Sequence, residues 1–172
     1  MKIALVGRHQ AKNEPFTPEV TTAIYKVIEM VGASEHSLAI ERGINRQLFG
    51  DSDHSFDHDK KITIEDATEC DVMIVIGGDG TALGAARTLQ GNGAILAVNG
   101  GHLGFISSTT LAELEATIAL LLKGKEHLQE QKRSSLVMHV NTGSPNYAPN
   151  DIVIERNTGR LIEFEVTTDD EK

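Results

Sequence analysis

Residues 77–81 read Gly-Gly-Asp-Gly-Thr and place one carboxylate, that of Asp79, among three glycines. The apolar, β-branched run 71–76 before them predicts a buried strand, and a helix-like stretch over 82–89 follows. Asp79 is therefore expected on a strand-to-helix turn. Glycines in such a turn let backbone amides approach phosphate, whereas the carboxylate suits a base that faces a hydroxyl or a group that holds a metal ion.

Gly-Asp-Gly is also ordinary turn chemistry, so a turn without catalytic duty remains a second interpretation of these residues. The segment is not a P-loop, because no Gly-Lys-Ser or Gly-Lys-Thr ends the turn. It also lacks the Gly-x-Gly-x-x-Gly spacing of a dinucleotide fingerprint. The usual nucleotide-binding motifs are therefore excluded at this position.

A second glycine-rich turn follows the next apolar strand. Residues 94–98 read Ala-Ile-Leu-Ala-Val and run into 99–105, Asn-Gly-Gly-His-Leu-Gly-Phe. Because the carboxyl ends of parallel strands meet at one edge of a sheet, we expect this loop to lie beside the first one. Further along the chain, Asn150 and Asp151 precede the segment 161–166, Leu-Ile-Glu-Phe-Glu-Val.

With these three motifs in this order and spacing, the chain resembles the NAD kinase family from its first residues to about Glu171. Gly-Gly-Asp-Gly-Thr alone is shared with diacylglycerol-type lipid kinases and resembles part of the phosphofructokinase site, so the other two motifs are what favour NAD kinase. The family continues with a loop of the form Thr-Gly-Ser-Thr-Ala-Tyr, which no segment here matches. The resemblance is therefore to the N-terminal portion of an NAD kinase.

The resemblance implies a role for each matched position. Asp79 would be the general base that takes the proton from the 2′-hydroxyl of the adenosine ribose of NAD, and Gly80 would lie against the dinucleotide. Phe105 would pack on the adenine, and the pair Asn150 and Asp151 would hydrogen-bond ribose or adenine. The other positions expected to contact substrate are Gly78, Thr81, Asn99 and Arg160.

Several of these positions also have a plainer interpretation. Phe105 lies in the apolar segment 103–106, and Phe is commonly buried, so it is also a candidate core residue. Asn150 and Asp151 are also typical of a turn before a strand. The segment 51–59 is rich in His and carboxylates, yet without helical spacing it is more typical of a hydrated loop than of a metal site.

Length and composition fit a globular protein. A chain of 172 residues, 40% hydrophobic and 24% charged, suffices for one domain with a core and the beginning of a second. The net charge of −9 argues against nucleic acid or an anionic membrane as partner. The apolar runs are far shorter than the roughly 20 residues that span a bilayer, and the first residues read as a strand rather than a leader. The single Cys70 excludes an internal disulfide and suits a reducing cytoplasm.

Strand and helix patterns alternate over the first 125 residues. We expect strands over 2–6, 37–41, 71–76 and 94–98, and helices over 17–32, 62–69, 82–89 and 110–123. This α/β order is typical of a Rossmann-like doubly wound parallel sheet and predicts an α/β domain over 1–125, which the resemblance implies to be the nucleotide-kinase domain. Beyond it, alternating segments at 135–140, 152–155 and 161–167 predict the start of a β-rich second domain over 126–172, which the resemblance implies to bind NAD.

The resemblance implies phosphoryl transfer from ATP, or from polyphosphate, to NAD, with a divalent cation such as Mg²⁺ carrying charge between the donor phosphates. No metal-ligating residues are assigned. A homo-oligomer is also expected, because an incomplete β-rich unit exposes a sheet edge, and the resemblance implies a dimer or tetramer. Two alternatives stay open: a catalytically incomplete NAD-binding or assembly fragment, and a diacylglycerol-type lipid kinase.

Overall fold

The structure, a computed structural model, describes residues 1–7, 15–49, 61–62, 69–101 and 104–155, together with positions 163, 165 and 167. Among these residues, six strands form one parallel sheet in the order β3-β2-β1-β4-β5-β6. The strands are β1 Lys2–Gly7, β2 Ser37–Glu41, β3 Lys61–Ile62, β4 Val72–Gly77, β5 Ala94–Asn99 and β6 Thr109–Thr110. This is the strand order of a doubly wound dinucleotide-binding sheet, so the predicted fold class is confirmed.

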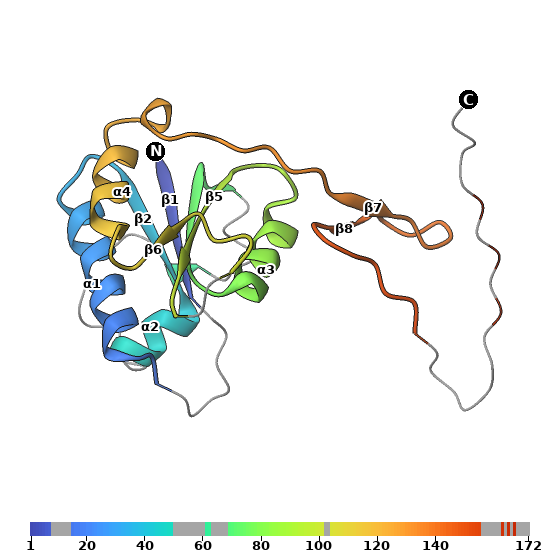
Figure 1. Ribbon diagram of the computed structural model, residues 1–172, viewed down its shortest axis with the longest axis horizontal. Helices are drawn as coiled ribbons and strands as arrows, with labels where there is room; N and C mark the ends of the chain where they lie inside the picture. Colours follow the sequence, from blue (N-terminus) through green and yellow to red (C-terminus); the bar gives the residue numbers. More distant parts are fainter. Residues whose placement is uncertain are drawn as a thin grey trace.

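Helices cover both faces of the sheet (Figure 1). The helices α1 Pro18–Gly32, α2 Arg42–Phe49 and α4 Leu114–Leu121 pack on one face, and α3 Asp79–Leu89 packs on the other. Along β1, Ile3 and Leu5 point into the α1 layer, while Ala4 and Val6 point into the α3 layer. Because the central strands are buried on both sides, their sequences read as continuous apolar runs. No helix in the described part of the chain has the length and apolar character needed to cross a membrane.

The first helix begins where the sequence predicts. Thr17 is the N-cap, its Oγ1 accepts a hydrogen bond from the backbone N–H of Val20 at 3.4 Å, and Pro18 opens the helix. Residues at helical spacing then form one buried face, namely Val20, Ala23, Ile24, Val27, Ile28 and Val31. The apolar period of the sequence thus determines which side of α1 covers the sheet.

Other elements differ from the expectation. The helix α2 lies where none is expected, because Ile44, its one buried residue, gives too short a pattern. A helix over 62–69 is wrong at its start, since Ile62 pairs with β2 as part of β3, and residues 63–68 lie outside the described residues. The helix α4 begins about a turn late. Here the Glu113 carboxylate accepts hydrogen bonds from both the N–H and the Oγ1 of Thr110, which holds 110–113 as a turn.

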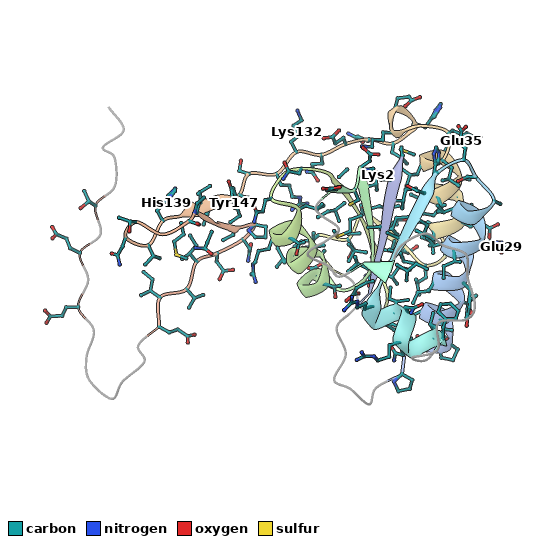
Figure 2. The ribbon with its side chains drawn as sticks, turned by 180° about the vertical axis from the view of Figure 1, so that it is seen from behind. Lys2, Glu29, Glu35, Lys132, His139 and Tyr147 are labelled. Atoms are coloured by element: carbon teal, nitrogen blue, oxygen red, sulfur yellow. The ribbon has the colours of Figure 1, made fainter. Side chains whose placement is uncertain are left out.

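Beyond a short 3₁₀ helix, Lys125–His127, the chain forms an antiparallel hairpin of β7 Leu136–Met138 and β8 Asn146–Ala148. The hairpin projects to one side of the parallel sheet (Figure 1), and Figure 2 shows His139 and Tyr147 on this arm, far from Glu29 on α1. The strand predicted over 152–155 is not formed, because this segment pairs with no described strand. Most of the strand predicted over 161–167 lies outside the described residues.

A carboxylate joins the amino-terminal ends of the two central strands. Asp71 lies just before β4, and its Oδ2 accepts a hydrogen bond from the backbone N–H of Lys2 at 2.7 Å. The backbone oxygen of Asp71 also accepts hydrogen bonds from Ala94 N–H at 3.1 Å and from Lys125 Nζ at 3.0 Å. The bond from Lys2 is the main reason that the pKa of Asp71 lies below its ordinary value.

Replacing Asp71 by Asn should therefore lower stability in a pH-dependent way. A folded-state pKa below the unfolded one means that the carboxylate stabilises the fold above about pH 4 and that this contribution disappears as the pH falls through the folded-state pKa. Urea unfolding should show Asp71→Asn less stable than the parent at pH 7, by a small amount because the side chain is exposed, with the difference shrinking below about pH 4. Glu69→Gln, which removes an exposed carboxylate 3.9 Å from Lys2 Nζ, is the matched control. An equal loss in both variants, or a loss independent of pH, would contradict the assignment.

Candidate functional site

The strand order reverses between β1 and β4, and this reversal locates the site. Connections from the two strands cross to opposite faces of the sheet, so their carboxyl ends border an open crevice. The strand β5 continues the same edge, since Gly77 at the end of β4 is in register with Asn99 at the end of β5. The N–H of Gly100 donates to the oxygen of Gly77 at 3.0 Å. The two glycine-rich loops therefore leave the sheet side by side, as the sequence predicts.

The first loop leads into α3 without a capping side chain. Gly78 is the N-cap, and its oxygen accepts hydrogen bonds from the N–H groups of Thr81 at 3.0 Å and Ala82 at 3.2 Å. The helix begins at Asp79, three residues earlier than predicted, so this carboxylate lies in the first turn, where the helix dipole favours negative charge. The space around Gly78 and Gly80 is open, since an added Cβ would meet no atom within 4 Å at either residue.

Gly77 and Thr81 are packed against each other. A Cβ on Gly77 would lie 2.5 Å from Thr81 Oγ1 and 2.9 Å from Thr81 Cβ. The Thr81 side chain therefore turns back over the end of β4. The absence of a side chain at Gly77 is what allows α3 to start so close to the strand.

The Asp79 carboxylate joins the two loops. Its Oδ2 accepts a hydrogen bond from the backbone N–H of Phe105 at 2.8 Å, and its Oδ1 accepts one from the N–H of Ile106 at 3.2 Å. An ionised carboxylate has about four lone-pair positions, so two remain for other donors. The arrangement can hold one or two hydroxyl groups while the loop amides keep the carboxylate in place.

The ring of Phe105 lies open to solvent, while the backbone of the same residue contacts the carboxylate. Its side chain is 96% exposed although its own N–H is bound to Asp79, so the interpretation of Phe105 as a core residue is wrong. In the same loop, Asn99 Oδ1 accepts a hydrogen bond from Gly101 N–H at 3.0 Å, which shapes the turn after β5. An exposed aromatic face next to an acceptor-only group suits a ligand that has both a flat base and hydroxyl groups.

The remaining predicted site residues are not joined to this cluster. Asn150 and Asp151 follow β8, both are exposed, and Asn150 Nδ2 donates to Asp151 Oδ1 at 2.8 Å. Within the described ranges no hydrogen bond connects this pair to the two glycine-rich loops. Arg160 and the segment 51–59 lie outside the described residues.

One further acidic residue lies at the same sheet edge and is not among the predicted site residues. Glu41 ends β2, is 4% exposed, and accepts a hydrogen bond from Gly7 N–H at the end of β1 at 3.2 Å. Burying a carboxylate is costly unless it is hydrogen-bonded, so this side chain holds the end of β1 at the crevice. Its signal in the sequence is an acid at the last position of an otherwise apolar strand.

The described residues contain no group of three or more His, Cys, Asp or Glu side chains that could hold a metal ion. The lone thiol, Cys70, is buried, and burial raises its pKa, which keeps it in the unreactive protonated form.

Comparison with known proteins gives one family. The model of the ATP-NAD kinase N-terminal domain matches residues 6–126. A protein named NAD kinase from Teredinibacter turnerae is 39% identical over 110 residues, which are 61% of this chain and 37% of that protein. Another, from Aromatoleum aromaticum, is 28% identical over 175 residues, which are 98% of this chain and 54% of that protein. The chain thus spans from about a third to about half of the length of these curated relatives.

A solved structure shares the fold. The crystal structure of yeast NADH kinase complexed with NADH is similar with a TM-score of 0.67, over 87% of this chain and 44% of that chain. The sequence identity is 20%, so the likeness concerns the arrangement of helices and strands.

The packing of Thr81 on Gly77 can be tested by stability measurements. Gly77→Ala should lower the free energy of unfolding by about 1–3 kcal/mol, because the new methyl group overlaps Thr81 Oγ1. Gly80→Ala, which faces open space in the first turn of α3, should be neutral or stabilising by up to about 1 kcal/mol. Urea denaturation of the two variants checks both values, and adding Thr81→Ala to Gly77→Ala should restore part of the loss. Equal effects of the two glycine substitutions would refute the packing argument.

Proposed function

The chain belongs to the ATP-NAD kinase family, whose N-terminal domain matches residues 6–126, and from this premise we propose that it serves the transfer of a phosphoryl group to the 2′-hydroxyl of the adenosine ribose of NAD. The donor is ATP or polyphosphate. The observation that carries the proposal is the Asp79 carboxylate at the start of α3, beside the exposed ring of Phe105 and at the edge where the strand order reverses.

On the acceptor side, Asp79 is the general base. Its two unoccupied lone-pair positions accept hydrogen bonds from ribose hydroxyl groups. The carboxylate takes the proton of the 2′-hydroxyl as the new O–P bond forms and the terminal phosphoanhydride bond of the donor breaks, which releases ADP or the shortened polyphosphate. The adenine lies against Phe105, whose ring has no protein neighbour to displace because it is 96% exposed. Asn99 and Gly80 line the same edge and complete the contacts to the nucleoside.

On the donor side, the backbone amides at the start of α3 receive phosphate oxygens. Gly78 offers no side chain, and the open space around it and around Gly80 leaves room for the close approach of an anion. Thr81, in the same first turn, supports this loop through its contact with Gly77. A divalent cation, Mg²⁺ in the simplest case, comes with the donor as part of the substrate and neutralises charge on its phosphates.

The segment over 126–172 forms the second unit of this proposal. Asn150 and Asp151 are polar and exposed at the end of the hairpin, and together with Arg160 they supply further contacts to ribose or adenine. This division assigns the phosphoryl-transfer chemistry to residues 1–125 and part of the NAD contacts to the β-rich unit. The exposed apolar side chains of the hairpin support assembly into a homo-oligomer. The cytoplasm is the compartment proposed for the protein, in keeping with its single cysteine.

A second candidate function is NAD binding, or assembly, without turnover. It is favoured by one observation: within the described residues, no hydrogen bond joins Asn150 and Asp151 to the loops that hold Asp79. The two functions are distinguished by measuring NAD binding by isothermal titration calorimetry beside NADP formation. Binding with product favours the kinase, and binding without product favours the second candidate.

Asp79→Asn should abolish most of the NADP formed by the purified chain from NAD, ATP and Mg²⁺. Loss of a general base costs roughly 10²- to 10⁴-fold in rate, and the fold should persist because Asp79 is at a helix start rather than in the core. A coupled assay for NADP, with circular dichroism to monitor folding, checks both parts. Turnover near that of the parent would remove Asp79 from the mechanism.

Phe105→Ala should weaken NAD binding without changing stability. Stacking of a base on an aromatic ring contributes about 1–3 kcal/mol, which corresponds to an affinity about 5- to 150-fold lower once the ring is lost. Because the ring is 96% exposed, the urea midpoint should stay within error of the parent value. Phe105→Tyr, which keeps the ring, is the control for affinity. Equal affinity of the Ala and Tyr variants would show that no base stacks here.

A further inference from the structure

We propose that Gly104 is a positioning residue for the reaction and acts through Asp79: it is glycine because the Asp79 carboxylate occupies the space that its side chain would fill. This inference rests on the proposed function in assigning the reaction, but the contact itself is a property of the fold. Gly104 lies in the second glycine-rich loop, one residue before the amide that donates to Asp79.

The evidence is the close approach of the carboxylate to the Gly104 backbone. A Cβ on Gly104 would overlap Asp79 Oδ1 and would lie 2.9 Å from Asp79 Cγ and 3.2 Å from Asp79 Oδ2. The backbone of Gly104 is not in the left-handed region, in contrast to Gly91 at φ 85° and Gly124 at φ 142°. The backbone conformation therefore does not require glycine at this position. The space that the Asp79 carboxylate occupies is what requires it.

The same loop also binds the carboxylate through two backbone hydrogen bonds. The N–H groups of Phe105 and Ile106 each bind one oxygen of Asp79, at 2.8 and 3.2 Å, and the carboxylate also lies against the backbone of Gly104. We call these three residues the cradle of Asp79. These contacts set the plane of the carboxylate and hence the direction of its free lone pairs. A side chain at 104 requires the carboxylate or the loop to shift, and we expect this shift to weaken at least one of the two bonds.

Two other glycines provide matched controls. Gly101 lies in the same loop, and Gly84 lies within α3; an added Cβ would meet no atom within 4 Å at either of them, and neither has positive φ. An alanine there tests the effect of an added methyl group without the overlap with Asp79. The comparison thus separates positioning of the carboxylate from general loss of glycine.

The amide proton shifts of Phe105 and Ile106 in the ¹⁵N-labelled chain measure the cradle directly. Both protons should lie downfield in the parent because they donate to a carboxylate. Gly104→Ala should move at least one of them upfield in the same direction as Asp79→Asn, whereas Gly101→Ala should leave both in place. Unchanged shifts in Gly104→Ala would overturn the proposal, whether or not the chain forms NADP.

A stability cycle covers the case in which Gly104→Ala folds poorly. The substitution should lower the urea midpoint in the parent, and it should have little effect in an Asp79→Ala background, where the obstacle has been removed. The same loss in both backgrounds would show that the methyl group meets something other than the carboxylate, and the proposal would fail.

Where NADP formation is measurable, the kinetics distinguish a positioning role of Gly104 from a purely structural one. Gly104→Ala should lower kcat by about 10- to 100-fold with KM for NAD changed much less, because a displaced base loses alignment while the base-binding ring is retained. Gly84→Ala should keep the parent kcat. Adding Gly104→Ala to Asp79→Asn should cause no further loss of kcat, and a full additive loss would show that Gly104 acts independently of Asp79.

Discussion

The parallel pairing of β1, β4 and β5 is the constraint on which the rest of the molecule depends. These strands are buried on both faces, so a slip of one residue in any pair would move side chains from the α1 layer into the α3 layer. The register places Gly77 opposite Asn99 and Gly7 opposite Ile76. The pairing of the strands thus sets the distance between the loops that follow them. These loops therefore need few contacts of their own to lie side by side.

The strands were predictable because burial on two faces leaves an unmistakable apolar run, and α1 because Thr17 and Pro18 mark its start. The elements that sequence reasoning missed are those whose cause is not local. Ile44 together with the partly buried Leu48 and Phe49 anchors α2, the two residues of β6 are defined by pairing with β5, and the residues before α4 form a turn closed by the bond from Glu113 N–H to the oxygen of Thr110. The segment 152–155 has an alternating pattern, yet the residues that pair with β7 are those of β8.

The position of the candidate site could be predicted from the sequence, but the contacts within it could not. The two glycine-rich motifs predict adjoining loops, and Asp79 stands out as the one carboxylate among glycines. What holds that carboxylate could not be foreseen, because main-chain donors leave no residue-type signature. The sequence around Phe105 does not show whether its ring is buried or exposed. The sequence around Glu41 shows only the end of a strand, and its bond to Gly7 is known from the structure.

The use of main-chain amides around Asp79 has a consequence for redesign. Any residue except proline supplies an N–H, so the identity of residue 105 can change while the carboxylate keeps its partner. In the proposed function, the side chain of residue 105 contacts the base and its backbone binds the Asp79 carboxylate, so these two contacts can be changed separately. A library of substitutions at position 105 would vary the side chain that faces the nucleoside while the Asp79 carboxylate keeps its backbone hydrogen bond. This independence would help in engineering the specificity for the acceptor nucleoside.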